Sequence, residues 1–449
     1  MFGPTSTSHL DRLLIAAGDA AVTFAAGLAA AWIRFPAQLL PQTLDELARH
    51  PGLVAWGLAS VLGLATTFDL YRPTSWRSTD QLLVRVLALA ITLPAAIALG
   101  VYLVPPWRFG RGLLVLTVIF TIVGIGLSRL VWIKTAARRP APTAVLIGNG
   151  PIVSELRAAL AACLIPPFRI TLHLPSLPAR EGSQAQLKGV EDADMIIVAE
   201  PGDTQTFDHL AELNFSGKTV VDAPAAYAAL SGRIPIRQVD ARWFIATGDF
   251  SSLATTPFRH IQRLLDVVGA CVFLTLGLPL FLVSSLAVLL TTGRPVLYRQ
   301  VRLGRFRRPF VLHKLRTMRS DAEPNGPQFA SPNDDRVSPV GRLLRRWRID
   351  EMPQLWNVLK GEMSLVGPRP ERPQVATELE RLIRFYAFRY SVRPGLTGWA
   401  QVNHTYCTWP EDHAVKLEYD LFFLRHYGPR LYGLILLRTL GALVFTPGR

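Results

Sequence analysis

The sequence predicts a membrane protein in three parts. An α-helical bundle of four membrane spans (residues 1–135) precedes a Rossmann-like α/β soluble domain (136–250) and a mainly helical domain (251–449) that carries a further apolar helix. Half of the 449 residues are apolar, which is enough for membrane spans beside soluble domains. Strand-like and helix-like patterns alternate in the middle of the chain, and the excess positive charge is concentrated in one segment of the last part.

Four apolar runs follow one another near the N-terminus, and each approaches the length of about 20 residues that a span requires. No cleavage pattern accompanies the first run, so we expect an uncleaved anchor. Asp19 lies within it and is costly in lipid, so we expect this side chain to face another helix. The runs are residues 13–33, 51–68, 86–107 and 112–128.

The distribution of basic residues predicts the orientation of this bundle. They gather between the second and third runs and again after the fourth, at Arg72, Arg77, Arg85, Lys134, Arg138 and Arg139. The positive-inside bias therefore places both ends of the bundle in the cytoplasm. A fifth uncharged run, residues 267–293, contains Pro279, which kinks a helix. This run either crosses the membrane as a kinked span or enters, bends and returns, and its residues alone leave both alternatives open.

The middle segment is typical of a small parallel sheet. "TAVLIGNG" reads as a buried strand that ends in a glycine turn, and "PIVSELRAALAA" reads as a helix with proline at its start. Gly148 and Gly150 match the first two glycines of a dinucleotide fingerprint, but Val153 stands at the third position, and a lone G-x-G is a weak signal. We expect a regulatory, structural or dimerising domain here, with a bound nucleotide as the alternative.

The charge pattern of the last part indicates partners that carry phosphate. The whole chain has a formal charge of +15, and residues 294–348 hold 14 Lys and Arg against 4 Asp and Glu, a net charge of +10. A membrane surface, a nucleic acid or a nucleotide substrate would each suit such a segment. Stacking of nucleic-acid bases needs aromatic side chains among the basic ones, and we expect the nearest, Phe306 and Phe310, to lie in the core.

Two adjacent carboxylates, Asp350 and Glu351, directly follow this basic segment. "PQLWNVLKG" then predicts a short helix with Pro353 in its first turn and Gly361 at its end. We expect the helix N-terminus and the nearby arginines to keep both carboxylates ionised. An ionised carboxylate can attack phosphorus, or it can hold Mg²⁺ together with substrate phosphates. The alternative is a surface cluster of ion pairs at a helix cap.

Three strings resemble the bacterial sugar transferase family, the polyprenyl-phosphate hexose-1-phosphate transferases or monotopic phosphoglycosyl transferases. They are "RQVRLGRFRRPFVLHKLRTM", "DDRVSPVGRLLRRWRIDEMPQLWNVLKGEMSLVGPRPERP" and "RPGLTGWAQVN". The likeness covers residues 257–449 closely, and the preceding parts resemble the long form of the family. It implies transfer of a hexose-1-phosphate from a UDP-sugar to undecaprenyl phosphate with release of UMP, as the first step of exopolysaccharide, capsule or O-antigen synthesis.

The resemblance also implies roles for particular residues. Asp350 would be the nucleophile that forms a covalent phosphosugar intermediate, and Glu351 would bind Mg²⁺ with Asp350 beside it. The phosphate-binding cations would be Lys314, Arg345 and Arg369. The family's membrane helix is re-entrant, here about residues 264–292 with its kink at Pro279, and it usually opens with a basic residue and an aspartate, here Arg263 and Asp266. The sequence departs from the family at Leu315, where phenylalanine is commoner, and Trp347 is also unusual; we expect the first to affect packing only.

Because UDP-sugars are cytoplasmic, the resemblance favours re-entry and a catalytic domain on the cytoplasmic face of the bacterial inner membrane. It also implies contact with membrane lipid, allows a homodimer and gives no role to nucleic acid. A membrane-anchored dehydratase is disfavoured, because no tyrosine is followed four residues later by lysine. The remaining alternative is a non-enzymatic membrane protein that assembles or regulates polysaccharide synthesis. The sequence does not distinguish which hexose is carried.

Overall fold

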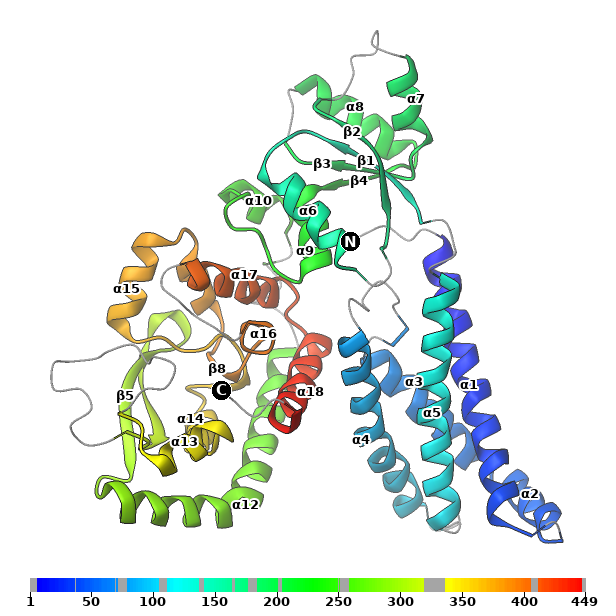
Figure 1. Cartoon of the computed structure of the whole chain (residues 1–449), viewed down its shortest axis with the longest axis vertical. Coiled ribbons are helices and arrows are strands. Elements are labelled where there is room, and N and C mark those ends of the chain that lie inside the picture. The colour runs from blue at the N-terminus through cyan, green and yellow to red at the C-terminus, as the bar shows by residue number, and fades with distance from the viewer. Residues whose placement is uncertain are drawn as a thin grey trace. The chain divides into compact units, whose positions relative to one another are not determined.

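The chain forms two compact units, Met1–Gly232 and Arg233–Arg449, which are described separately (Figure 1). The computed structural model describes residues 6–36, 38–68, 70–71, 79–104, 111–136, 141–163, 166–176, 184–200, 204–248, 250, 258–318, 336–404 and 411–445. The basic residues predicted to orient the bundle at 72, 77, 138 and 139 lie outside this range, so the predicted orientation stays a prediction.

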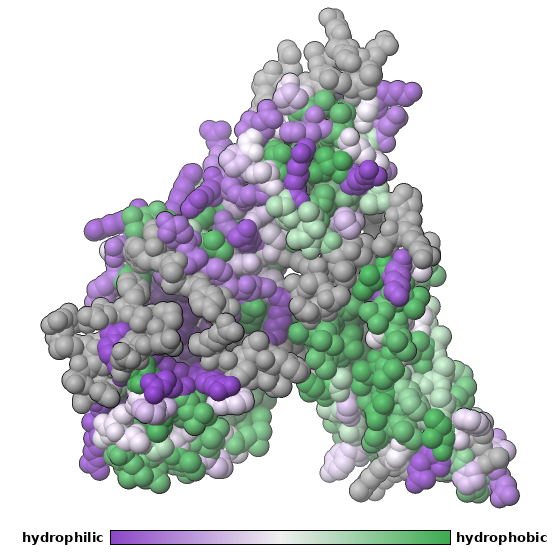
Figure 2. All heavy atoms as spheres, viewed as in Figure 1, coloured by the Kyte–Doolittle hydropathy of each residue, from purple (hydrophilic) through white to green (hydrophobic). Residues whose placement is uncertain are grey.

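The first part of the N-terminal unit is helical, as predicted. Its helices are α1 (Ser6–Arg34), α2 (Leu40–Arg49), α3 (Pro51–Thr67), α4 (Thr79–Leu103) and α5 (Arg111–Ala136). Among the described residues, α1, α4 and α5 are long and apolar enough to cross a membrane, whereas α3 is apolar but has only 17 residues. Figure 2 shows apolar side chains over the surface of these helices, as expected for a face that meets lipid.

Asp19 faces another helix, as its position in an apolar run predicts. Its two carboxylate oxygens accept hydrogen bonds from the Arg129 guanidinium on α5, at 2.9 and 2.5 Å. Both side chains are almost fully buried, and the Tyr71 ring lies under the guanidinium with its centroid 5.8 Å away. Each charge therefore has a close partner, and the pair joins the first helix of the bundle to the last.

The second part of the N-terminal unit contains the predicted parallel sheet. Its elements are β1 (Thr143–Ile147), α6 (Pro151–Ala161), β2 (Arg169–Leu174), α7 (Gln184–Asp192), β3 (Met195–Val198), α8 (Thr204–Phe215), β4 (Thr219–Asp222) and α9 (Ala223–Ser231). The strand order is β2-β1-β3-β4, with all pairs parallel. One face packs on α6 and α9 through Leu146 and Leu156, and the other packs through Val145 and Leu210. Val153 lies in the first of these cores, so the third fingerprint position serves packing.

The C-terminal unit is mainly helical, with two small two-stranded sheets. Its elements are α10 (Ala241–Ala246), α12 (Phe258–Thr292), β5 (Leu297–Leu303), the 3₁₀ turn η3 (Arg305–Arg307), β6 (Pro309–Leu315), α13 (Pro339–Arg346), η4 (Ile349–Glu351), α14 (Gln354–Lys360), β7 (Ser364–Val366), α15 (Pro373–Leu382), η5 (Tyr386–Ser391), β8 (Gly395–Thr397), α16 (Trp399–Asn403), α17 (Glu411–Arg425) and α18 (Pro429–Phe445). Strands β5 and β6 form an antiparallel hairpin, and β7 pairs with β8 in parallel.

Helix α12 has 35 residues with Pro279 inside it, and its composition would suit a membrane span. Figure 1 shows its axis turning between the two halves. The first half is bound to the rest of the unit: Asp266 accepts hydrogen bonds from Ser364 Oγ and Leu365 N, each at 2.9 Å. The second half packs through Val288 against Leu315 and other buried side chains. Both halves therefore contact the same compact unit.

Three sequence expectations can be compared with side chains of this unit. Leu315 is fully buried, so the departure from the family pattern affects packing, as predicted. Phe310 is buried, as expected. Phe306 is not in the core: it is 61% exposed, has a left-handed backbone (φ 54°) in the hairpin turn, and lies against the Arg305 guanidinium. The tight turn between β5 and β6 points this ring outward.

Candidate active site

The acidic pair lies in a tight turn between two short helices. Ser338 caps α13 by accepting a hydrogen bond from Gly341 N at 2.9 Å. Arg348 then takes a left-handed conformation (φ 52°), which is uncommon for a residue with a Cβ and reverses the chain into η4. Pro353 stands before α14, and Gly361 ends it with a φ of 84°. The short helix that the sequence predicts is confirmed, and Gly361 ends it as expected; Pro353, expected in its first turn, is the residue directly before it.

Arginines, rather than a helix end, contact Glu351. Arg369 Nη2 donates to Glu351 Oε1 at 2.9 Å, and Arg348 Nη1 lies 3.5 Å from Glu351 Oε2. Asp350 and Glu351 belong to the 3₁₀ turn η4, and α14 itself has only seven residues. Both carboxylate residues are buried, with 7% and 9% of their surfaces exposed. The alternative, a surface cluster of ion pairs at a helix cap, would not bury two adjacent acids.

The two acids have different proton affinities. Burial, with the neighbouring Glu351 second, raises the pKa of Asp350 to about 6. Burial also opposes ionisation of Glu351, but the attraction of Arg369 and then Arg348 outweighs it and lowers that pKa. The sequence predicts that the surrounding cations keep both carboxylates ionised; at Asp350 desolvation and the like charge of Glu351 oppose these cations and raise the pKa. At neutral pH, Asp350 is still mainly ionised.

The three predicted phosphate-binding cations all act on Asp350. The positive charges that lower its pKa belong to Lys314, Arg345 and Arg369. Arg345 is in the last turn of α13, and its Nε donates to Thr317 Oγ1 at 2.9 Å. Burial, with Arg345 second, lowers the pKa of Lys314 to about 8. The structure thus brings together five residues that the sequence spreads over more than fifty positions.

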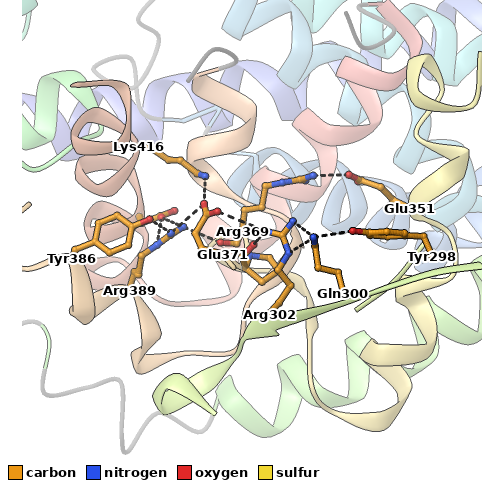
Figure 3. Close-up of polar contacts among 11 residues, drawn as sticks. Tyr298, Gln300, Arg302, Glu351, Arg369, Glu371, Tyr386, Arg389 and Lys416 are labelled. Carbon is orange, nitrogen blue, oxygen red and sulfur yellow. Dashed lines mark hydrogen bonds and ion pairs between the residues drawn. The ribbon is translucent and has the colours of Figure 1, made fainter. Parts of the chain in front are cut away.

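A buried charge network behind Arg369 was missed at the sequence level (Figure 3). Glu371 forms ion pairs with Lys416 at 2.7 Å and with Arg389 at 3.5 Å. Arg389 also pairs with Asp420 at 2.7 Å and donates through Nη2 to Arg369 O at 3.0 Å. Burial disfavours ionised Glu371, but Lys416 and Arg389 hold its pKa far below the usual range. Only the position of Glu371, two residues after Arg369, could have signalled this network.

Strands β7 and β8 belong to two different strings of the family resemblance, and their backbones lie close together. A Cβ on Gly367 would lie 2.4 Å from Arg393 O, and a Cβ on Gly395 would lie 2.0 Å from Gly367 N. No side chain fits at either position, so both residues must be glycine for β7 and β8 to pair. The pairing fixes the start of the loop that carries Arg369.

The residue types at the site suit a magnesium ion. Mg²⁺ commonly uses one or two carboxylates and completes its coordination with water and substrate phosphates. Asp350 and Glu351 supply two adjacent carboxylates, and within the described ranges no larger group of His, Cys, Asp or Glu could hold a metal by itself. A metal here would compete with Arg348 and Arg369 for the oxygens of Glu351.

The predicted membrane-helix residues contact the same elements. Arg263 donates to Val358 O at 2.6 Å and to Leu359 O at 2.7 Å, at the C-terminal end of α14. A Cβ on Gly277 would lie 2.4 Å from Met352 Cε, so α12 passes close to the residue after Glu351. Fold and site together define a membrane-associated protein in which an acidic pair lies among cations suited to phosphate groups.

Comparisons with known proteins place this site in a family. A model of the bacterial sugar transferase family matches residues 258–446. The UDP-N-acetylgalactosamine-undecaprenyl-phosphate N-acetylgalactosaminephosphotransferase of Aeromonas hydrophila is 38% identical over 212 residues, 47% of this chain and 49% of that protein. The UDP-glucose:undecaprenyl-phosphate glucose-1-phosphate transferase of Caulobacter vibrioides is 49% identical over 144 residues, 32% of this chain and 53% of that protein. This chain therefore spans about half the length of each of these two relatives.

The uncharacterized sugar transferase EpsL of Bacillus subtilis is matched over most of its length. It is 38% identical over 168 residues, which make up 37% of this chain and 79% of that protein. The chain belongs to the bacterial sugar transferase family, as its motifs predict.

Proposed function

We propose that this protein transfers a sugar-1-phosphate from a UDP-sugar to undecaprenyl phosphate and releases UMP. The single observation that carries the proposal is the buried pair Asp350–Glu351 with Lys314, Arg345 and Arg369 around it. Burial of two adjacent acids is costly, so their position calls for a reason, and a diphosphate substrate needs both cationic contacts and a nucleophile. The names of the relatives agree with this reaction class.

The reaction runs in two displacements. A carboxylate oxygen of Asp350 attacks the β-phosphorus of the donor, and the bond from that phosphorus to the oxygen bridging to the α-phosphate breaks. UMP leaves with the bridging electron pair, and the sugar phosphate remains on Asp350 as an acyl phosphate. An oxygen of undecaprenyl phosphate then attacks the same phosphorus, giving the lipid diphosphate sugar and free Asp350.

The surrounding side chains divide the remaining work. Lys314, Arg345 and Arg369 would bind phosphate oxygens and stabilise the charge that develops in each displacement. A Mg²⁺ ion held by Glu351 and Asp350 would neutralise the leaving phosphate. The raised pKa of Asp350 fits a nucleophile, because a carboxylate that bonds a proton more strongly also attacks phosphorus more readily.

We infer that α12 is re-entrant and that the catalytic unit lies on the cytoplasmic face of the bacterial inner membrane. A straight helix of 35 residues would be roughly 50 Å long and would separate its two ends across the bilayer. Asp266 in the first half and Val288 in the second half instead contact one compact unit. Pro279 between them supplies the break in the hydrogen-bond ladder that a turn requires.

A labelling experiment tests this topology. Arg308 is exposed at the β5–β6 turn. An Arg308→Cys variant, made without the native cysteines, should resist an impermeant thiol reagent in intact cells and react after the membrane is opened. Labelling in intact cells would place the catalytic unit outside and contradict re-entry.

The activity itself is tested with purified protein, Mg²⁺ and a panel of UDP-sugars that includes UDP-glucose and UDP-N-acetylgalactosamine, the donors named for the two relatives. We expect UMP release from at least one donor and a sugar-bearing lipid when undecaprenyl phosphate is added. Failure with every donor, from protein that is folded and inserted in membrane, would favour a non-enzymatic role in polysaccharide assembly.

A further inference from the structure

Strand β5 carries three polar side chains on one face, because side chains of a strand alternate between its faces. Tyr298, Gln300 and Arg302 are joined end to end (Figure 3). Gln300 Nε2 donates to Tyr298 Oη at 3.1 Å, and Gln300 Oε1 accepts from Arg302 Nε at 3.0 Å and Nη2 at 2.6 Å. These three residues are called the β5 ladder below.

One end of the β5 ladder meets Lys314. Tyr298 is the cross-strand partner of Lys314 in the β5–β6 hairpin. The Lys314 Nζ lies 5.0 Å from the centroid of the Tyr298 ring, within the range of a cation–π contact. A lysine side chain has four rotatable bonds, so this contact limits where the ammonium can be.

The other end holds the loop of Arg369. Arg302 Nη1 donates to Pro370 O at 3.0 Å and lies 3.8 Å from Glu371 Oε2. Arg389 binds the neighbouring carbonyl, Arg369 O, at 3.0 Å. The two residues after Arg369 are therefore fixed by an arginine from β5, while its own carbonyl is fixed by an arginine from η5.

Gln300 joins these two ends. Burial, with the charge of Glu371 opposing it, lowers the pKa of Arg302 to about 10, so this guanidinium depends on its hydrogen-bond acceptors. Gln300 supplies two of those bonds through one oxygen. Removing that oxygen would leave part of a buried cation unsatisfied, and the guanidinium would shift toward other acceptors.

We propose that Tyr298, Gln300 and Arg302 are positioning residues that set the spacing between Lys314 and Arg369. These are two of the cations that bind the donor diphosphate in the proposed function. This inference rests on the proposed function. Phosphoryl transfer depends mainly on position and electrostatics, so a small shift of either cation should weaken the binding of the diphosphate. The β5 ladder connects two cations that come from separate strings of the sequence, and Gln300 touches neither.

The test uses Gln300→Met, which is similar in size and removes all three hydrogen bonds of the Gln300 side chain, one to Tyr298 and two to Arg302. Arg299→Gln is the matched control, because Arg299 is exposed and points to the opposite face of the same strand. Hydrogen exchange of the amides in residues 364–372 should become faster in Gln300→Met and stay unchanged in Arg299→Gln. In an Asp350→Asn background, which prevents turnover, Gln300→Met should weaken the binding of UDP by about tenfold.

A conservative variant and a double mutant separate positioning from general stability. Gln300→Glu should restore part of the affinity, because its carboxylate can accept hydrogen bonds from both Arg302 and the Tyr298 hydroxyl. Gln300→Met should add little to the loss caused by Arg369→Ala, since part of its effect acts through Arg369. If Gln300→Met does not fold, Tyr298→Phe provides the same comparison, because it removes only the hydrogen bond between Gln300 and Tyr298.

Two results would contradict the positioning role of the β5 ladder. One is unchanged hydrogen exchange in residues 364–372 of Gln300→Met. The other is a loss of UDP affinity in Gln300→Met that adds fully to the loss in Arg369→Ala. Failure of the proposed function would look different. Wild-type protein would then release no UMP from any UDP-sugar, while the exchange comparison would still decide whether Gln300 fixes the Arg369 loop.

Discussion

Two buried clusters of opposite charges, one in each unit, differ in how completely their charges are matched. In the helical bundle, one aspartate meets one arginine: both oxygens of Asp19 are bonded to Arg129. In the C-terminal unit, Asp350 and Glu351 share several cations, and the pKa of one acid is raised while that of the other is lowered. A closed pair fixes two helices together. In the proposed mechanism, the unequal cluster keeps one acid reactive and keeps cations available for a phosphate.

The largest expected effect is on the reaction rate, and it should follow substitution of Asp350 but not of Asp19. Asp350→Asn removes the attacking oxygen, so UMP release should fall by roughly a thousandfold or more. Steady-state release from the best donor measures it, and Asp19→Asn, compared per folded molecule, is the control that should leave the rate unchanged. Near-normal UMP release by Asp350→Asn would mean direct transfer between the two substrates without a covalent intermediate.

A substitution at Asp19 should lower the stability of the protein, whereas the substitution at Asp350 is expected to lower the reaction rate. Asp19→Asn leaves the buried charge of Arg129 without its counter-charge, so unfolding should become easier by about 3–5 kcal/mol. Thermal unfolding in one detergent measures the change. The double variant Asp19→Leu/Arg129→Leu should recover most of the loss, because no uncompensated charge remains. A double variant as unstable as the single one would mean that the pair contributes a net attraction of its own.

Removal of one shared cation should have a smaller effect than removal of the nucleophile. Arg369→Ala should cost about 2–4 kcal/mol of transition-state stabilisation, as loss of a single preorganised donor does. The ratio kcat/KM for the UDP-sugar measures it. Arg346→Ala is a suitable control, since Arg346 is an exposed arginine of the same cluster of sequence. Equal losses in both variants would indicate that Arg369 acts only through the overall positive charge of this region, without a specific contact to the substrate.

The smallest expected effect concerns pH. Because the pKa of Asp350 is raised to about 6, its reactive form is present above that pH and is lost as the pH falls through it. The acid limb of kcat/KM should therefore lie near pH 6. Glu351 raises this pKa, so Glu351→Gln should move the limb to lower pH, whatever it does to the maximal rate. A limb that moves upward would show that Glu351 does not repel the charge of Asp350.

Sequence patterns predicted features that depend on local order. The apolar runs, the parallel sheet and the ends of α14 at Pro353 and Gly361 follow from periodicity, proline and glycine. The motifs also named the residues that gather around Asp350. Their roles remain predictions, since geometry alone does not assign a nucleophile.

Features that depend on distant partners could not be predicted in this way. Glu371 and Lys416 are 45 positions apart, and nothing local marks them as a buried pair. The pKa of Asp350 depends on burial that only the folded chain creates. The left-handed Arg348, which turns the chain into the site, has no sequence signature such as glycine.

In the proposed mechanism, Asp350 forms a covalent bond with the sugar phosphate. The most direct measurement incubates wild-type protein with its UDP-sugar and no lipid acceptor, quenches the reaction quickly and analyses the peptides by mass spectrometry. We predict UMP release of up to one equivalent, with the mass of the sugar phosphate on the peptide that contains Asp350. Active protein that releases UMP only when undecaprenyl phosphate is present, and that carries no added mass, would contradict a covalent intermediate on Asp350.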